Sequence, residues 1–479
     1  MHRKIMDISK RRGIMYPSFE IYGGVSGFYD YGPIGSKIKR NIEQLIRNYY
    51  VIDEECLEVE CPTLSPEEVW IASGHLENFT DLMTECLKCG EAYRADHLIE
   101  EYTGGSCEGM HMSQLDDLIE KNRIRCPKCG GDLGKIYNYN LMFQTFVGPG
   151  KGKESAYLRP ETAQTTYLAF RRLWEVARKK LPLGVLQIGR SFRNEISPRQ
   201  GIIRLREFNQ AEIQFFVEPD KKFVENFDQV SKIKTRVVTK DGKEFDISLE
   251  NAVKKGIIGI QMIAYFLGRS LQLFERMGIN PKSLKLRQHK DEERAFYSTD
   301  TWDIEYISKI FGRIELVGVS DRTDYDLKAH MDLSKRDMTV SYEGKRFIPH
   351  VIEVAYGIDR PFYCVIESCY REEKNRTFFK FPPEIAPYRV GVFPLVRKDN
   401  LPERAREVFE LMKREGIHAF YDQTGSIGKR YARADEIGIP ECVTIDYETM
   451  EDNTVTVRDR DTKKQIRVKI DELCEFILK

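Results

Sequence analysis

The sequence predicts an α+β fold in which helices flank an antiparallel sheet and a smaller α/β domain follows towards the C-terminus. Apolar runs at 185–193 and 210–217 have the composition of buried strands, and the polar loop between them contains Pro198 and Gly201, which predicts an antiparallel pair. After residues 381–383 (Phe-Pro-Pro), strand and helix patterns alternate, as is typical of a small α/β domain with a mixed sheet. A chain of 479 residues is long enough for about three domains.

A long helix and a strand precede this pair of strands. Apolar residues recur at helical spacing from Ile34 to Tyr50, directly after a Gly-Pro turn signal, and predict the helix. Residues 56–61 alternate apolar and polar side chains and predict a strand that Pro62 ends. We assign both elements to the core of the protein.

Two further stretches have a different character. Residues 220–294 carry a charged hairpin at 237–247 and then a helical run at 257–277, so this segment has the character of an insertion. In the C-terminal domain, the expected strands are 388–393, 418–421 and 441–445, and the expected helices are 402–415 and 428–437.

The composition describes a globular protein without a charged tail. Its 75 basic and 75 acidic side chains give a formal net charge of zero, so a nucleic-acid partner must be bound by local basic patches. The longest apolar stretch, 256–268, is much shorter than the roughly 20 residues that span a bilayer. The basic N-terminus lacks the apolar stretch of a secretory signal. Eleven cysteines, scattered except for two close pairs, argue against a disulfide scaffold. We therefore expect a cytoplasmic protein without a membrane partner.

Charged and aromatic residues converge at one end of the predicted strand pair. Arg193-Asn194-Glu195 ends the first strand, and Arg206-Glu207-Phe208 begins the second. The guanidinium fork suits phosphate oxygens, an aromatic face can stack on adenine, and a carboxylate can accept from an exocyclic amine. The pattern favours nucleotide binding, although a surface hairpin joined by salt bridges would explain this segment taken alone.

Longer segments decide between these alternatives. Residues 191–199 together with 204–208 resemble motif 2 of the glycyl-tRNA synthetases, residues 357–360 (Gly-Ile-Asp-Arg) resemble motif 3, and the helix and strand that end at Pro62 resemble motif 1. The resemblance covers most of the chain and extends to residues 73–75, 93–97, 158–164 and 321–327.

This resemblance implies a class II synthetase fold and its reaction. The reaction is the ATP-dependent attachment of glycine to tRNA(Gly) through a glycyl-adenylate, with release of AMP and pyrophosphate. A homodimer built around motif 1 is implied as well. The implied domains are a catalytic core at 1–80 and 138–380, a zinc-binding insertion at 81–137, the insertion at 220–294, and an anticodon-binding domain at 385–479.

The resemblance assigns the reaction with ATP to three catalytic residues. Arg193 would bind the α-phosphate, Arg360 would hold the phosphates from the opposite side, and Glu315 would bind Mg²⁺ on the leaving pyrophosphate. Fixed cations at these oxygens lower the barrier because negative charge accumulates there. The full implied ATP-binding set is Arg193, Asn194, Glu195, Ile203, Arg204, Leu205, Arg206, Glu207, Phe208, Glu315, Leu316, Gly357 and Arg360.

Glycine offers a binding site only an ammonium and a carboxylate. Selectivity therefore requires acids around the ammonium and no space for a side chain. The resemblance places Glu161, Glu212 and Glu353 around the ammonium. Arg322 would lie beside them, and Arg94 would reach in from another loop.

One segment of the glycine site departs from the family. The family usually has Glu-Pro-Ser before motif 3, whereas this chain has Glu353-Val354-Ala355, so a serine hydroxyl that would line the site is missing. A lost hydrogen bond of this kind is worth roughly 1 kcal/mol. A synthetase for another small amino acid, such as alanine or serine, is therefore the alternative within the same class.

Two CxxCG pairs predict a structural zinc site. The two-residue spacing lets both thiolates of a pair face one tetrahedral ion, and the glycine permits the turn. The alternatives are four free thiols, or Cys107 or His111 as substitute ligands. The four predicted ligands are Cys86, Cys89, Cys126 and Cys129.

In the C-terminal domain, residues 392–395 (Val-Phe-Pro-Leu) and 425–431 (Gly-Ser-Ile-Gly-Lys-Arg-Tyr) resemble the anticodon-binding domain that several class II synthetases share. The C-terminal domain contains a cluster of cations and aromatic rings, as expected where single-stranded bases stack, and a solvated helix face is the alternative. The cluster comprises Tyr421, Lys429, Arg430, Tyr431 and Arg433.

A relative that binds nucleic acid without adenylation, such as a polymerase accessory subunit, is the alternative from another class. A pure binding module has no need for a set of phosphate ligands. The presence of Arg193, Glu195, Glu315 and Arg360 therefore argues against it.

Overall fold

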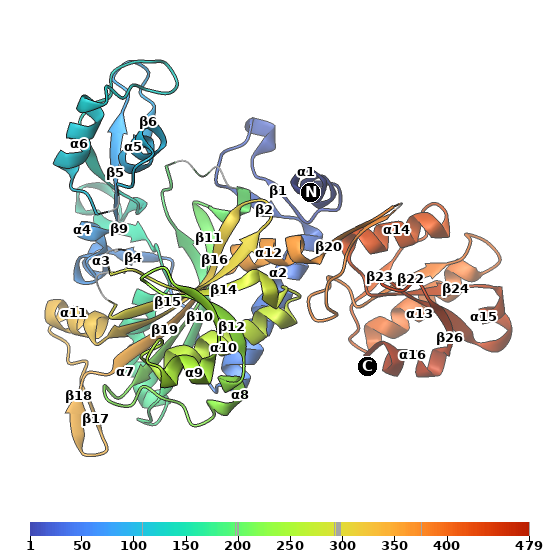
Figure 1. Cartoon of the computed structure of the whole chain (residues 1–479). Coiled ribbons are helices and arrows are strands. Elements are labelled where there is room, and N and C mark those ends of the chain that lie inside the picture. Colours follow the sequence, from blue (N-terminus) through green and yellow to red (C-terminus); the bar gives the residue numbers. More distant parts are fainter. Residues whose placement is uncertain are drawn as a thin grey trace.

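The computed structural model is built around a nine-stranded sheet (Figure 1). It describes every residue except 108, 197, 199–200, 292, 294–297, 375 and 479. In order across the sheet, the strands are β13 (Glu244–Ser248), β12 (Lys234–Val238), β14 (Leu284–Gln288), β15 (Asp300–Ser308), β16 (Gly312–Thr323), β19 (His350–Gly357), β11 (Glu207–Val217), β10 (Leu183–Phe192) and β3 (Leu57–Val59). Neighbouring strands are antiparallel except for β12–β14 and β10–β3, which are parallel. The predicted antiparallel sheet is therefore confirmed for its central strands.

The predicted strand pair is the centre of this sheet. β10 and β11 pair in continuous antiparallel register from Leu183 opposite Phe216 to Phe192 opposite Glu207. Two residues of the connecting loop that were quoted for motif 2, Ser197 and Arg199, lie outside the described residues.

The two faces of the sheet differ because side chains alternate along each strand. On one face of β11, Ile213 and Phe215 belong to the largest hydrophobic cluster. Helix α10 (Gln261–Arg276) packs on this face, and Phe266 stacks on Phe215 with the ring centroids 4.2 Å apart. On the other face, Gln210, Glu212 and Gln214 are buried polar side chains. The polar face carries the site described below.

The segment 220–294 is part of this architecture. It supplies β12, β13, β14 and α10, together with the short helices α8 (Asp228–Ser231) and α9 (Leu249–Lys254). Its charged hairpin forms an edge of the sheet, whereas α10 lies almost entirely in the core. The segment thus extends the central sheet and is not a separate body.

The N-terminal residues wrap along the sheet before the predicted long helix. They form α1 (His2–Arg11), β1 (Met15–Pro17) and β2 (Tyr29–Tyr31). The predicted helix is α2 (Pro33–Arg47), which continues into a π-helical turn at Asn48–Asp53. Pro33 occupies the first turn of α2, where its missing N–H costs nothing.

A small insertion projects from the central body (Figure 1, upper left). Its strands β5 (Thr80–Glu85), β6 (Ala92–Arg94) and β7 (Tyr137–Asn140) form a three-stranded sheet, which packs with α5 (Ala95–Thr103) and α6 (Met112–Lys121). The predicted cysteine pairs lie in this insertion.

The C-terminal domain has the predicted mixed sheet. Its strand order is β23 (Ala419–Tyr421), β22 (Val390–Pro394), β24 (Glu441–Ile445), β25 (Thr454–Asp459) and β26 (Gln465–Lys469), with parallel pairing among the first three and antiparallel pairing beyond. Its helices are α13 (Leu401–Arg414), α14 (Ile427–Ile437), α15 (Tyr447–Asp452) and α16 (Ile470–Leu478). Arg11 and Arg12 form ion pairs with Glu436, so the N-terminal helix contacts this domain.

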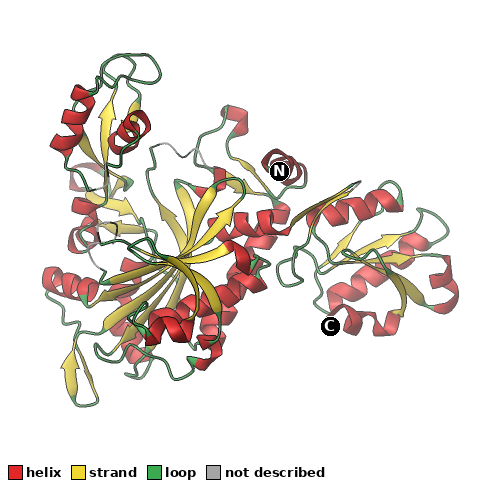
Figure 2. Ribbon diagram, in the orientation of Figure 1, coloured by secondary structure: helices red, strands yellow, loops and turns green. Residues whose placement is uncertain are grey.

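Shorter elements complete the central body, as Figure 2 shows. They are β4 (Leu64–Pro66), α3 (Glu67–Ala72), α4 (His75–Asn78), β8 (Gln144–Val147), β9 (Glu154–Leu158), α7 (Ala163–Val176), α11 (Tyr325–Ser334), β17 (Val340–Tyr342), β18 (Lys345–Phe347), α12 (Asp359–Cys369), β20 (Tyr370–Glu373) and β21 (Arg376–Phe379). Within the described residues, we find no helix that is both long and apolar enough to cross a membrane.

The start of α2 depends on a close approach that only glycine permits. A Cβ atom on Gly35 would lie 1.8 Å from the backbone oxygen of Ile14. We expect Gly35→Ala to lower the free energy of unfolding by about 1–3 kcal/mol, because the chain at Ile14 must move. The matched control is Gly428→Ala in α14, where a Cβ meets nothing within 4 Å. Denaturant unfolding should show the control within about 1 kcal/mol of the parent or more stable, and equal values for the two variants would contradict the close approach.

Candidate active site

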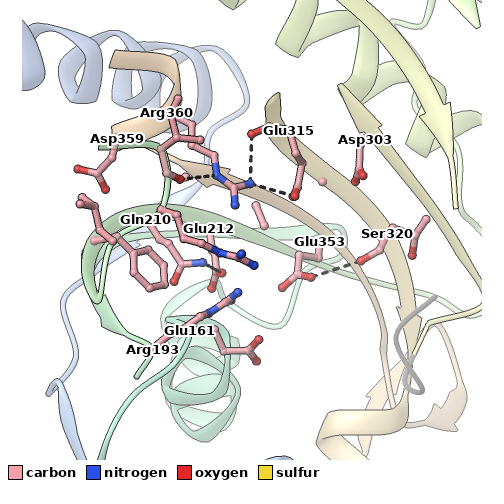
Figure 3. Close-up of a pocket in the computed structure, with 18 of the residues that line it drawn as sticks. Glu161, Arg193, Gln210, Glu212, Asp303, Glu315, Ser320, Glu353, Asp359 and Arg360 are labelled. Carbon is pink, nitrogen blue, oxygen red and sulfur yellow. Dashed lines mark hydrogen bonds and ion pairs between the residues drawn. The ribbon is translucent and has the colours of Figure 1, made fainter. Parts of the chain in front are cut away.

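A cavity of about 320 Å³ opens on the polar face of the central sheet (Figure 3). Strands β11, β15, β16 and β19 and the start of α12 supply most of its walls. The lining residues are Glu161, Arg193, Glu195, Ile202, Ile203, Arg204, Leu205, Phe208, Gln210, Glu212, His289, Glu293, Thr301, Asp303, Glu315, Gly318, Ser320, Glu353, Ala355, Gly357, Asp359 and Arg360.

Strand pairing explains why residues so distant in sequence meet here. In the pairing register, Glu212 lies opposite Ala355, which lies opposite Gly318 on the next strand. Two residues away along the same two strands, Glu353 lies opposite Ser320. Residues at every second position share a face, so these side chains point into the same space.

Three buried glutamates form one end of the cavity. Glu161, Glu212 and Glu353 have only 7%, 3% and 7% of their surface exposed. The fully buried guanidinium of Arg322 lies behind them, with its Nη1 3.1 Å from Glu353 and its Nη2 3.5 Å from Glu161. It also forms a 2.8 Å ion pair with Asp326 on α11. Within this group of described residues, carboxylates outnumber the cation.

Because the carboxylates outnumber the cation, the three glutamates have different pKa values. Burial alone would raise the pKa of Glu161, but the neighbouring Arg322 and His75 lower it below its usual value. Burial, assisted by the charge of Glu161, raises the pKa of Glu353 despite Arg322. Burial and the charges of Glu353 and Glu161 raise the pKa of Glu212 to about 8. Glu212 therefore holds a proton near neutral pH, because the carboxylate charges of Glu353 and Glu161 outweigh that of Arg322 around it.

Polar neighbours hold these glutamates in place. The Thr162 hydroxyl donates to Glu212 at 2.6 Å, and the amides of Gln210, Gln164 and Gln214 donate at 2.9 Å to Glu212, Glu161 and Glu353, respectively. Sequence reasoning missed all four. A usable signal existed for two of them, since Gln210, Glu212 and Gln214 occupy every second position of β11 among apolar residues.

Two arginines and an aromatic ring form the other end of the cavity. The guanidinium of Arg193 lies 5.2 Å from the ring centre of Phe208 and 5.3 Å from that of Phe79. Arg360 forms a 3.0 Å ion pair with Glu315 and donates to the backbone oxygen of Ile203 at 3.3 Å (Figure 3). The cations thus approach from opposite walls.

Asp303 and His289 are also part of this end, and the sequence did not single out Asp303. Nε2 of His289 lies 2.6 Å from a carboxylate oxygen of Asp303. Burial and the neighbouring Glu315 raise the pKa of Asp303 to about 6. For Glu315, burial alone would raise the pKa, but Arg360 holds it below its usual value. A Cβ on Gly318 would lie 3.5 Å from Asp303 and 4.0 Å from Glu315, so both carboxylates face one opening. Carboxylate oxygens of this kind suit Mg²⁺.

The four predicted cysteines lie together in the insertion. The sulfur atoms of Cys86 and Cys129 are 3.5 Å apart, those of Cys89 and Cys126 are 3.7 Å apart, and all four lie within 4.8 Å of one another. Cys107, the proposed substitute, is buried in the hydrophobic core of the insertion.

Comparison with known proteins agrees with this arrangement. Residues 146–369 match the model of the tRNA synthetase class II core domain (G, H, P, S and T), and residues 389–479 match that of an anticodon binding domain. The glycine–tRNA ligase of Methanocaldococcus jannaschii is 44% identical to this chain, over 100% of this chain and 98% of that protein. Those of Methanothrix thermoacetophila and Thermococcus sibiricus are each 41% identical, over 99% of this chain and 96% and 97% of their own lengths.

The chain belongs to the glycine–tRNA ligase family. Its alignments with these relatives run over 571 and 557 positions, more than the 479 residues of this chain, so the relatives carry segments that it lacks. The predicted class II core and C-terminal anticodon-binding domain are confirmed. The residues that match the class II core domain include the β10–β11 pair, the other strands around the cavity and α12.

Most of the residues that the glycyl-tRNA synthetase resemblance assigned to ATP line the cavity, but four do not. Leu316 belongs to the hydrophobic core, at a β-bulge of β16 that lies opposite Ile304 and Glu305. Asn194 contacts Tyr139, Glu207 pairs with Arg190 outside the cavity, and Arg206 donates to the backbone oxygens of Glu195 and Ser26.

Arg94 is also placed elsewhere than expected. It pairs with Asp81 at 3.2 Å and with Asp96 at 2.6 Å, and it lines a second cavity of about 640 Å³ between the insertion and the β10–β11 loop. It does not reach the buried glutamates, because two carboxylates of its own insertion hold it.

The predicted base-stacking cluster of the C-terminal domain needs a similar correction. Arg430 is buried and donates to the backbone oxygens of Pro394 and Gly425, so it holds the loop before α14 together. Arg433 pairs with Asp422, and Tyr431 is partly buried. Lys429 remains exposed on α14.

The Arg322 network gives a prediction for stability. Arg322→Met removes the guanidinium that contacts the buried carboxylates of Glu161, Glu353 and Asp326, so we expect the free energy of unfolding to fall by about 3–5 kcal/mol near neutral pH. The pKa values of these carboxyls in the folded variant would lie above those in the unfolded chain. Stability would then be retained at low pH and lost as the pH rises through the raised values. The loss relative to the parent protein should be larger at pH 8 than at pH 5 in urea unfolding.

Arg346→Met is the matched control, because Arg346 forms an exposed ion pair with Asp337. Such pairs contribute about 0–1 kcal/mol. A loss for Arg322→Met that equals the control, or that does not depend on pH, would contradict the role of Arg322 as counter-ion.

Proposed function

We propose that this chain uses ATP to attach glycine to tRNA(Gly) through a glycyl-adenylate. The observation that carries the proposal is a single cavity that joins a pocket of three buried glutamates to a pair of opposed arginines. The glutamate pocket suits a small ammonium ion, and the arginines suit phosphate oxygens. The family of the chain supports the same reaction.

The glutamate end would bind the amino acid. Glu161, Glu212 and Glu353 would accept hydrogen bonds from its ammonium, and the proton on Glu212 would leave as the ammonium enters. The positive charge of Arg322, which contacts Glu353, would balance part of the negative charge of the glutamates. Burial of the glutamates restricts the site to a small ligand.

The arginine end would bind ATP. A carboxylate oxygen of glycine attacks the α-phosphorus, a new O–P bond forms, and the bond to pyrophosphate breaks. Arg193 and Arg360 would stabilise the charge that develops on the phosphoryl oxygens, and Phe208 would stack on adenine. Glu315 and Asp303 would hold Mg²⁺, which when bound neutralises charge on the pyrophosphate.

In the second step, the terminal ribose hydroxyl of tRNA would attack the adenylate carbonyl, and AMP would leave. The C-terminal domain would hold the anticodon of that tRNA, as its family match suggests. A homodimer around motif 1 and a cytoplasmic location, where tRNA is charged, belong to the same proposal. The exposed apolar side chains of Phe19, Ile21 and Tyr22, shortly before α2, support a protein interface there.

The substrate can be tested by ATP–pyrophosphate exchange with each of the twenty amino acids. We expect strong stimulation by glycine. Ala355 favours one other candidate, a synthetase for another small amino acid, so alanine and serine are the critical comparisons. Stimulation by alanine or serine without glycine would refute the proposed substrate.

Arg193 provides a test of the adenylation step. We expect Arg193→Ala to reduce exchange at least about 100-fold, because a cation aimed at the transition-state charge is lost. Arg190→Ala, three residues earlier in β10, is the matched control, since Arg190 is exposed and lies outside the cavity. The thermal unfolding of both variants should match that of the parent. Normal exchange in Arg193→Ala would refute the assigned role.

We also propose that the four cysteines bind one structural Zn²⁺ ion. Four sulfur atoms within 4.8 Å of one another match the Cys₄ donor set of such sites, and the positive φ of Gly90 and Gly130 lets each chain turn beneath the ion. Bound zinc would link the two cysteine pairs and so stabilise the fold of the insertion.

Zinc content tests this directly. Elemental analysis of protein purified without chelator should give about one zinc per chain, and Cys126→Ser should lower the content strongly. Cys107→Ser is the matched control within the insertion and should keep its zinc, because Cys107 lies in the hydrophobic core. Protein without zinc, or equal loss from both variants, would contradict the site.

A further inference from the structure

The glycine end of the cavity contains a hydroxyl that the motif comparison did not point to. Ala355 lines this end of the cavity, so strand β19 presents a methyl group there. Ser320, on the neighbouring strand β16, lines the same cavity and is only 5% exposed. Its Oγ lies 3.3 Å from a carboxylate oxygen of Glu353 (Figure 3).

The pairing of β16 with β19 puts positions 320 and 355 around one space. Ser320 lies opposite Glu353, and Ala355 lies opposite Gly318. Ser320 and Ala355 are therefore diagonal neighbours on the same face of adjacent strands, about 7–8 Å apart by the usual geometry. A small molecule between them can be reached by a hydroxyl from either strand. The absence of a side chain at Gly318 keeps this space open.

The chemistry of a hydroxyl fits this position. A serine hydroxyl has one donor and two acceptor lone pairs. When it donates to Glu353, its lone pairs remain to accept a hydrogen bond. The ammonium group of an amino acid has donors and no acceptors, so it fits a position beside both this hydroxyl and the carboxylate of Glu353.

We propose that Ser320 is a specificity-determining residue of the amino-acid pocket. It presents a hydroxyl to this space from β16, whereas Ala355 presents only a methyl group from β19. Its hydroxyl donates to Glu353 and accepts from the ammonium of glycine, so it fixes both the carboxylate and the ligand. This inference rests on the proposed function, because it assumes that the pocket binds glycine.

The test is the Michaelis constant for glycine in ATP–pyrophosphate exchange. Ser320→Ala should raise KM for glycine about tenfold or more, the effect of one hydrogen bond to a charged group, while kcat and KM for ATP change less than twofold. Ser320→Cys keeps the approximate volume but offers a weak acceptor, so it should raise KM for glycine in the same way. Ser341→Ala, on the exposed β17–β18 hairpin, is the control and should leave all three constants unchanged.

Rescue distinguishes a specificity role from a structural one. Adding Ala355→Ser to Ser320→Ala should return KM for glycine to within twofold of the parent value, because the hydroxyl is restored from the other strand. An unchanged KM in Ser320→Ala, a failed rescue, or an equal loss in kcat and in KM for ATP would overturn the inference. If the parent protein shows no exchange with glycine, the proposed function itself fails.

Discussion

Four carboxylates and one guanidinium share a buried space on the central sheet, and their charges must balance. Glu161, Glu353 and Asp326 contact Arg322, which is fully buried, while Glu212 lies beside them with a raised pKa. A buried carboxylate is stable only if it is paired, hydrogen-bonded or protonated, and each of these solutions occurs here. The same shortage of positive charge makes the pocket suited to a ligand that brings an ammonium.

The rest of the fold makes this polar space possible. Because side chains alternate along strands, the face opposite the cavity can be mainly apolar, and α10 covers it with residues such as Phe266 against Phe215. Residues that meet in the cavity come from strands that are far apart in sequence, as with Glu212 and Glu353. Each strand alternates polar and apolar side chains. The antiparallel register aligns the polar side chains of neighbouring strands, so that together they form one site.

Much of this arrangement was predictable from the sequence, since it depends on local patterns. The β10–β11 pair, helix α2, the mixed C-terminal sheet and the grouping of four cysteines all have short signals in period or spacing. The remainder depends on partners that only tertiary structure brings. Arg94 is held by Asp81, Arg430 is buried against loop carbonyls, and Asp303 becomes part of the site through strand pairing. The charged hairpin at 237–247 suggested an insertion, whereas its strands extend the central sheet.

The central claim is that a proton on Glu212 stands in for the ammonium of the ligand. It can be measured by titrating glycine into the protein calorimetrically at pH 7, in buffers with different ionisation enthalpies, and extracting the number of protons released on binding. With the pKa of Glu212 at about 8, the account predicts the release of about one proton, and Glu212→Gln should release close to none. Glycine binding without proton release in the parent protein would contradict it.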